Sequence, residues 1–126
     1  MFNNIFLVGL GGCLGSIARY LSVAFVNRSL ILAEFPYGTL LVNVLGCLVI
    51  GFLGGLAVNK QFLSEHSRLF LFTGILGGFT TFSAFSLETF YLMRTAHWAL
   101  ALLNVTAQLM LGLGATALGY WVSKAL

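Results

Sequence analysis

Residues 38–58 read GTLLVNVLGCLVIGFLGGLAV, a run of 21 residues without a charged side chain. A helix of about 20 apolar residues crosses the hydrocarbon core of a bilayer, which is about 30 Å thick. Three more stretches are long and apolar enough to do the same: residues 4–26, residues 69–94 and residues 98–123. Because the connections between them are short, we expect an all-α membrane protein whose single domain, residues 1–126, has four transmembrane helices.

The composition of the whole chain supports this assignment. Hydrophobic residues make up 60% and charged residues 7% of the 126 residues, against roughly 45–50% and about 25% in soluble domains. The net charge is +3 without a basic cluster, so nucleic-acid binding is not expected. Cys13, Cys47, His66 and His97 have no metal-ligand spacing, which argues against a zinc site. We recognise no targeting segment ahead of the first span, which suits a bacterial inner membrane.

Lysines and arginines are nearly balanced between the two ends of the predicted helices. Those on the side of the N-terminus are Lys60, Arg68 and Lys124; those on the other side are Arg28, Arg94 and, if a charge inside a span counts, Arg19. Orientation in a membrane follows an excess of these residues on the cytoplasmic side. The balance favours insertion in both orientations, and the alternative is that a partner or another feature fixes one.

Glycines recur four residues apart on three of the predicted helices. The pairs are Gly11 and Gly15, Gly51 and Gly55, and Gly74 and Gly78. Such pairs let helix backbones approach closely in lipid, although glycine is also common in membrane helices in general. Three pairs favour a tightly packed bundle. Four helices alone make a poor pore, so we also expect a homo-oligomer.

Two charged residues lie furthest inside the predicted spans, Arg19 and Glu88. Their helices run in the same direction and both lie six to eight residues before a helix end, so we expect them at similar depth. One interpretation is a salt bridge, or an arginine that extends to the headgroups. The other is that Arg19 lines a water-filled vestibule and attracts anions.

Uncharged polar residues form stripes on the second and fourth predicted helices. Thr39 and Asn43 are four residues apart, and Asn104, Gln108 and Thr116 share one face of the fourth helix. Hydrogen bonds between helices would explain both stripes. A path lined by amides and hydroxyls without an acid would instead favour an anion over a metal cation.

The densest polar feature is GGFTTFSAFS, residues 77–86, in the middle of the third span. Two glycines followed by two β-branched threonines weaken a helix, so we expect a break at residues 77–80. Backbone groups freed inside a membrane need a partner from protein, water or an ion. Phe79, Phe82 and Phe85 recur every three residues there, either as packing groups or as the lining of an ion path.

Together these residues resemble the Fluc (CrcB) family of small fluoride channels. The segments GGCLGSIARY (residues 11–20), GTLLVNVLG (residues 38–46) and GGFTTFSAFS (residues 77–86) are similar to the motifs of the family's first three helices, in the same order. The resemblance covers the whole chain. It implies an antiparallel, dual-topology homodimer with two fluoride pores, each formed by both subunits, through which fluoride leaves the cell passively.

The resemblance also implies roles for single residues. Phe82 and Phe85 would contact fluoride through their ring edges, and Asn43 would offer its amide. Backbone carbonyls of Gly77 and Thr80 from both subunits would hold one structural Na⁺ at the dimer centre. The other candidate pore residues are polar or charged: Thr39, Ser83, Arg19, Glu88, Asn104, Gln108 and Thr116. The chain departs from the family's hydroxyl track on the fourth helix, where it has Gly112 and two amides.

Two other classes of membrane protein fit the composition. A proton-coupled exporter of the small multidrug resistance type is also short and has four helices, but it needs an acidic residue in its first helix, and this chain has none there. A non-conducting membrane adaptor would use the polar stripes only for packing. An enzyme is not expected, because His66 and His97 lie at span ends and no nucleophile is paired with a base.

Overall fold

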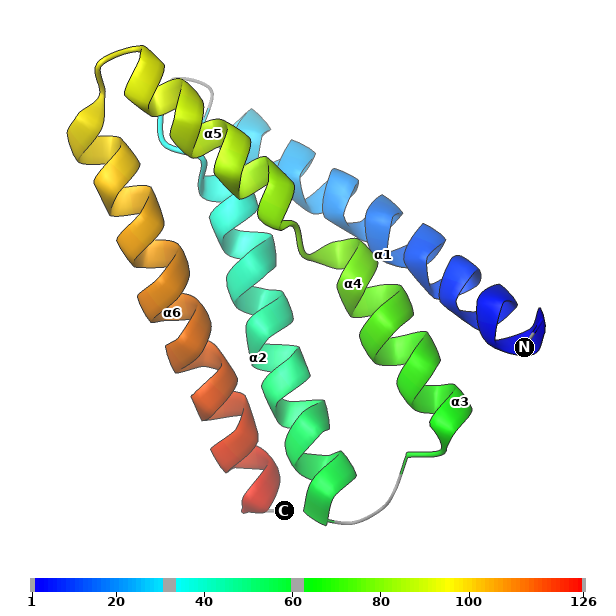
Figure 1. Cartoon of the computed structure of the whole chain (residues 1–126). Coiled ribbons are helices and arrows are strands. Elements are labelled where there is room, and N and C mark those ends of the chain that lie inside the picture. The colour runs from blue at the N-terminus through cyan, green and yellow to red at the C-terminus, as the bar shows by residue number, and fades with distance from the viewer. Residues whose placement is uncertain (1, 31–33, 60–62, 126) are drawn as a thin grey trace.

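The computed structural model describes residues 2–30, 34–59 and 63–125. Three spans are continuous helices, α1 (Phe2–Ser29), α2 (Tyr37–Asn59) and α6 (Trp98–Lys124). The third span consists of α3 (Glu65–Arg68), the π-helical segment η1 (Leu69–Leu76), α4 (Gly77–Phe79) and α5 (Phe82–Arg94) (Figure 1). The four spans are long and apolar enough to cross a membrane. This confirms the four predicted helices and the interruption of the third.

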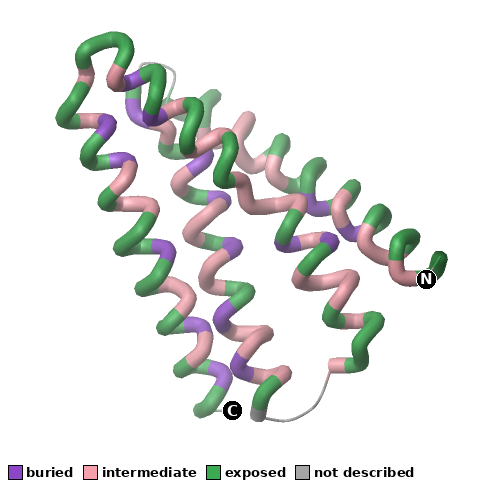
Figure 2. Tube along the Cα trace, in the orientation of Figure 1, coloured by how far each residue is buried: buried purple, intermediate pink, exposed green. Residues whose placement is uncertain are grey.

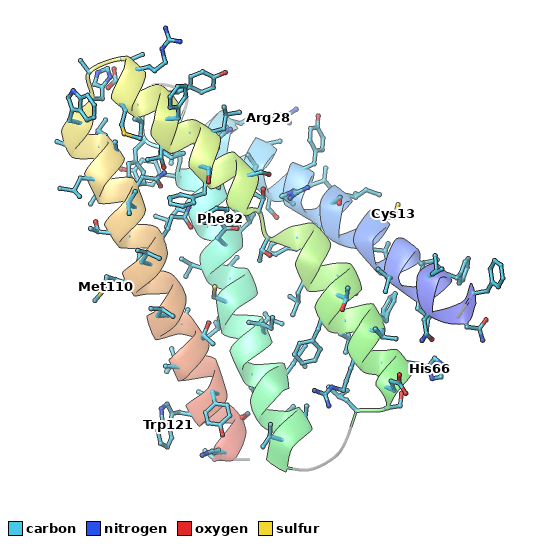
Figure 3. The ribbon with its side chains drawn as sticks, in the orientation of Figure 1. Cys13, Arg28, His66, Phe82, Met110 and Trp121 are labelled. Carbon is cyan, nitrogen blue, oxygen red and sulfur yellow. The ribbon has the colours of Figure 1, made fainter. Side chains whose placement is uncertain are left out.

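The two ends of the bundle differ in what they hold. Both chain termini and α3 lie toward one end, the terminal end, and the turn between α5 and α6 lies at the other, the turn end (Figure 1). Arg28 lies toward the turn end, whereas His66 and Trp121 lie toward the terminal end (Figure 3). This agrees with the sides assumed in the charge count, although Lys60 lies outside the described residues. Insertion in both orientations stays a prediction.

Glycines bring α1 into backbone contact with η1 and α4. A Cβ atom added to Gly11 would lie 2.6 Å from the carbonyl oxygen of Phe70 and 2.9 Å from the Cα atom of Gly74. A Cβ atom on Gly78 would lie 2.6 Å from a backbone oxygen of α1. The glycine pairs predicted on the first and third spans therefore face each other, and the helices meet backbone to backbone.

Close glycine contacts also join α2 to α6 in the terminal half of the bundle. A Cβ atom on Gly51 would collide with the carbonyl oxygen of Thr116, and one on Gly55 with the hydroxyl of Ser123. From the other side, a Cβ atom on Gly119 would lie 2.7 Å from the backbone nitrogen of Phe52. The expectation of a tightly packed bundle is confirmed for both helix pairs.

The interruption of the third span lies at Thr80 and Thr81, slightly later than expected. Both residues are extended, with φ and ψ of −85° and 157° at Thr80 and −151° and 114° at Thr81. Gly77 and Gly78 are helical and belong to α4. The break expected at residues 77–80 therefore does not include the two glycines, and the missing side chain of Gly78 serves the close approach of α1 instead. Thr81 then caps α5, since its hydroxyl accepts the backbone N–H of Ala84 at 3.2 Å.

Burial follows the pattern of a membrane protein. The outward surfaces of the helices are exposed and rich in large apolar side chains (Figure 2). Polar residues lie among the most buried: Thr39, Thr89, Asn104 and Ser123. Exposed Trp98 and Trp121 are 23 positions apart on α6, about 35 Å at 1.5 Å per residue. This spacing suits tryptophans at the two interfaces of a bilayer.

Candidate functional site

Asn43 of α2 holds the two extended residues of the third span in place. Its side-chain oxygen accepts the backbone N–H of Thr81 at 2.8 Å, and its Nδ2 donates to the carbonyl oxygen of Thr81 at 3.1 Å. The same Nδ2 donates to Oε1 of Gln108 on α6 at 3.1 Å. Asn43 therefore supplies partners for backbone groups that lack helical ones, and it links three of the four spans.

A groove of about 340 Å³ opens beside this point, which we call the central groove. Six predicted site residues line it: Asn43, Gly77, Thr80, Phe82, Phe85 and Gln108. Its other described lining residues are apolar or small and none is acidic. The groove therefore combines amide groups and aromatic rings without a carboxylate that would attract a cation.

The two phenylalanines of the central groove form an edge-on pair at the start of α5. Their ring centroids are 5.4 Å apart with an interplanar angle of 61°. Phe82 is 77% exposed on the isolated protomer, and Figure 3 shows it at the start of α5. Phe79 lies apart from the pair, because its ring faces α2 at Gly46, where an added Cβ atom would lie 3.6 Å from it. The triplet thus has one packing ring and two groove rings.

A second and larger cavity, which we call the vestibule, lies on the turn side of the two extended threonines. Its volume is about 720 Å³, and four predicted site residues line it: Arg19, Thr39, Ser83 and Glu88. Thr81 lines both the vestibule and the central groove. One threonine therefore separates a cavity with charged residues from one with only uncharged ones.

Arg19 and Glu88 share the vestibule without forming an ion pair. Nη1 of Arg19 donates to the carbonyl oxygen of Thr80 at 3.2 Å. Oε1 of Glu88 accepts the hydroxyl of Thr39 at 2.6 Å, and Oε2 of Glu88 has no partner among the described residues. The salt-bridge interpretation is wrong in this protomer, and both charges are held by neutral groups at the wall of the vestibule.

The polar stripe of α6 divides into three separate environments. Asn104 is fully buried, and its Nδ2 donates to the hydroxyl of Thr89 on α5 at 2.9 Å. The hydroxyl of Thr116 donates to the carbonyl of Gly112 on its own helix at 3.0 Å. Neither Asn104 nor Thr116 lines the central groove or the vestibule, so Gln108 is the member of the stripe that reaches the groove.

The predicted carbonyl ligands lie at the edge of the groove. In a continuous helix the Gly77 carbonyl would accept the N–H of Thr81, but that N–H donates to Asn43. Gly77 is also exposed on the protomer. The Thr80 carbonyl already accepts from Arg19, and its second lone pair remains for another partner. The donor set is thus of the oxygen type that hard cations prefer.

Two residues that the sequence did not single out complete the network. Thr81 joins Asn43 to both cavities. Thr89 of α5 joins Asn104 to this helix by accepting from its Nδ2 at 2.9 Å, and its own hydroxyl donates to the carbonyl of Phe85 at 2.7 Å. Thr81 lies inside the quoted third-span segment, so its neighbours give a signal. Thr89 gives none, because a threonine that bonds the carbonyl four residues earlier is ordinary in a helix.

Comparison with known proteins matches this architecture. A family model for CrcB-like proteins, described as camphor resistance (CrcB), matches residues 6–120. The chain belongs to the CrcB family. It is 47% identical over 121 residues to a fluoride-specific ion channel FluC of Parabacteroides distasonis, covering 96% of this chain and 93% of that protein. For FluC of Methylobacillus flagellatus the identity is 44% over 121 residues, 96% of this chain and 94% of the relative.

Membership of the CrcB family confirms the resemblance seen in the three helix motifs. The matches run through all four spans, so they cover the central groove and the vestibule together. The family is one of membrane ion channels and not of enzymes. It excludes the small multidrug resistance exporter that shares the length and helix number.

Proposed function

We propose that this CrcB protein is a fluoride-specific channel that lets fluoride leave a bacterial cell passively across the inner membrane and so lowers its cytoplasmic concentration. The observation that carries the proposal is the edge-on pair of Phe82 and Phe85 in a groove that has amides and no acid. The relatives from Parabacteroides distasonis and Methylobacillus flagellatus carry the name of fluoride-specific channels. Residues 1–126 would act as one channel domain.

The chemistry of the central groove suits a small, strongly hydrated anion. Fluoride sheds water only where several groups of positive polarity replace it. Amide hydrogens do so directly, and the edge of an aromatic ring carries the positive part of its quadrupole. Neutral groups also bind an anion weakly enough for it to leave, as conduction requires.

A second protomer completes the pore in this proposal. Phe82 and Gly77 are exposed at mid-membrane on the isolated protomer, so the central groove is open on one side. An antiparallel partner would cover it, and two-fold symmetry would give two equivalent pores in one homodimer. The near balance of lysine and arginine supports insertion in both orientations.

The vestibule would lead fluoride to the groove. Arg19 would draw the anion in, and Thr39, Ser83 and Glu88 would line its way, since all four residues face the same cavity. Gln108 and Asn43 would receive it beside the phenylalanines. Asn104 and Thr116 would not touch the ion. They would stabilise the helices beside the path through their hydrogen bonds to Thr89 and to the carbonyl of Gly112.

A structural Na⁺ at the dimer centre belongs to the proposal as well. Carbonyls of Gly77 and Thr80 from both protomers would hold it, and the loss of the helical partner of Gly77 supports this. The ion would hold the two protomers together at the interrupted helices, and it would not travel with fluoride. Replacing Na⁺ by a bulky organic cation is then expected to weaken the dimer and its activity.

The decisive experiment measures fluoride and chloride efflux from liposomes that contain the purified protein. We expect fluoride efflux without chloride efflux, and its loss by at least about 100-fold in Phe82→Ile and Phe85→Ile, because an aliphatic side chain fills space but has no positive edge. Phe79→Ile is the matched control, since this ring packs on α2, and it is expected to be milder. Folded dimers of both Ile variants that conduct at the native rate would show that the rings only pack.

A further inference from the structure

The peptide unit that joins Thr80 to Thr81 in the interrupted span is held from both sides by side chains of other helices. Its N–H donates to the side-chain oxygen of Asn43 on α2 at 2.8 Å, and its carbonyl accepts Nη1 of Arg19 on α1 at 3.2 Å. One end of this peptide unit therefore meets a neutral amide, and the other end meets a cation.

The charge of Arg19 at this carbonyl is not offset by a carboxylate. Glu88 is the other charged residue that lines the vestibule, and its Oε1 accepts the hydroxyl of Thr39 instead. Arg19 is only partly buried, but a guanidinium in a protein stays charged. The Thr80 carbonyl therefore faces a permanent positive charge.

The same carbonyl is one of those proposed to hold the structural Na⁺. A carbonyl oxygen has two lone pairs, so the contact with Arg19 leaves one of them for a metal ion. A cation bound there would share a single oxygen atom with the guanidinium. Two like charges so close together repel each other, and partial burial weakens the screening of that repulsion.

Arg19 has two opposite effects on a metal ion at this oxygen. Its hydrogen bond orients the carbonyl, which favours binding, and its charge repels a cation. The orientation does not depend on Arg19 alone, because Asn43 holds the N–H end of the same peptide unit. The N–H and the hydroxyl of Thr80 also both donate to the carbonyl of Leu76, at 3.0 and 2.9 Å. Repulsion is therefore the larger effect.

We infer that Arg19 is coupled to the sodium site: its charge weakens Na⁺ binding at the Thr80 carbonyl and so sets the Na⁺ concentration at which the dimer is stabilised. The inference rests on the proposed function and deepens it, because one residue then serves both the vestibule and the metal site. Coupling between two sites is reciprocal. Thr80 would hold the guanidinium less firmly when Na⁺ is bound, which leaves Arg19 freer to meet an anion in the vestibule.

The test follows the thermal midpoint of the purified dimer while NaCl replaces N-methyl-D-glucamine chloride at constant ionic strength. Arg19→Met removes the charge and the donors, whereas Arg19→Gln removes the charge and keeps an amide that donates. In both variants we expect the half-saturating Na⁺ concentration to fall by at least about 10-fold, because a nearby unit charge is lost. Arg19→Lys keeps the charge and is expected to need as much Na⁺ as the native protein.

Arg28→Gln is the matched control. It removes a cation from the same helix toward the turn end, and Arg28 lines neither the vestibule nor the central groove (Figure 3). We expect its half-saturating Na⁺ concentration to equal that of the native protein. An equal fall in Arg28→Gln would mean that only net charge matters. An unchanged or higher concentration in Arg19→Met and Arg19→Gln would mean that Arg19 only orients the carbonyl. Either result would overturn the inference.

Fluoride efflux is not the readout, because Arg19 also faces the vestibule and its loss would slow fluoride entry for a separate reason. A native dimer whose midpoint does not respond to Na⁺ would overturn the structural sodium site and the inference with it. Absence of fluoride efflux from the native protein would overturn the proposed channel function alone, since the midpoint of the dimer does not depend on transport.

Discussion

In the terminal half of the bundle the helices meet through glycine backbones, whereas in the turn half they meet through hydrogen-bonded side chains around cavities. Gly11, Gly51 and Gly119 have neighbours so close that no Cβ atom fits. Toward the turn end the contacts are Thr39 with Glu88 and Asn104 with Thr89. The boundary between the two halves is the pair of extended threonines in the third span.

The difference shows how a small membrane protein reconciles stability with an ion path. Lipid gives little hydrophobic reason for helices to associate, so close van der Waals packing has to do it. Close packing leaves no room for an ion. Concentrating the glycine contacts in one half leaves the other half free for the vestibule and for polar groups. In an antiparallel dimer, the terminal half of each protomer, which we call the dense half, would lie beside the turn half of its partner.

The largest effect is expected from breaking the dense half at Gly119. In Gly119→Ala the new methyl group would meet the backbone of α2, including the nitrogen of Phe52 at 2.7 Å. Backbone cannot move aside as a side chain can, so we expect a loss of about 3 kcal/mol, at the upper end for overpacking. Thermal unfolding in detergent with size-exclusion chromatography measures it.

The control for Gly119→Ala comes from the same helix. Gly114 has no atom within 4 Å of an added Cβ atom, and its substitution by alanine also improves helix propensity. Gly114→Ala is therefore expected to be neutral or slightly stabilising on the protomer. Equal destabilisation by both substitutions would mean that glycine acts through helix flexibility, and the contrast between the two halves would fail.

An intermediate effect is expected at the boundary, where Gly46 of α2 meets Thr80. A Cβ atom on Gly46 would collide with the Cγ2 methyl of Thr80, a side-chain atom and not backbone. Gly46→Ala is expected to cost about 1–2 kcal/mol, because one methyl too many is forced into the contact. Thr80→Ser removes that methyl and keeps the hydroxyl that donates to Leu76.

The double variant Gly46→Ala with Thr80→Ser sharpens this prediction. It should recover most of the lost stability, which a double-mutant cycle of unfolding free energies measures directly. Additive effects of the two substitutions would show that Gly46 is needed for another reason. Recovery would show that the contact between Gly46 and Thr80 can be relieved by changing one side chain, unlike the backbone contacts of the dense half.

How far these contacts follow from the sequence depends on the distance along the chain that they span. Hydropathy alone predicts the four spans, and the spacing of four predicts glycine pairs such as Gly51 and Gly55, because both depend on local patterns. The exact place of the interruption does not follow from local propensity. It depends on Asn43, 38 residues away, which takes the backbone N–H of Thr81.

The candidate site also has features that local patterns predict and features that depend on residues distant in the chain. The sequence predicted Phe82, Phe85, Asn43 and Gln108, and the structure places all four at one groove. Residue spacing did not separate Phe79 from the other phenylalanines, which only the family resemblance did. It also did not separate Gln108 from Asn104 and Thr116, because residues three, four or eight positions apart lie on similar faces of a helix. These residues are separated because different helices pack against them. The π-helical segment before α4 also changes the direction in which the following side chains point, and no pattern in the sequence predicted that segment.

The smallest effect is expected at the outer rim of the turn half, where Nε2 of His97 lies 3.1 Å from Oε2 of Glu34. The side chains are 41% and 62% exposed, respectively, so solvent screens the pair and Glu34→Gln should cost at most about 0.5 kcal/mol. Thr95 holds the ring, with its hydroxyl 2.9 Å from Nδ1 of His97. The measurement is the difference in unfolding free energy between native protein and Glu34→Gln at low salt and in 1 M NaCl.

Ionic strength separates charge from packing at this pair. An exposed ion pair is screened at 1 M salt, where the Debye length is about 3 Å. The difference between native protein and Glu34→Gln should therefore be present at low salt and vanish in 1 M NaCl. A difference that persists in salt would mean that Glu34 acts by packing, so that the rim of the turn half is stabilised by contact and not by charge, as the dense half is.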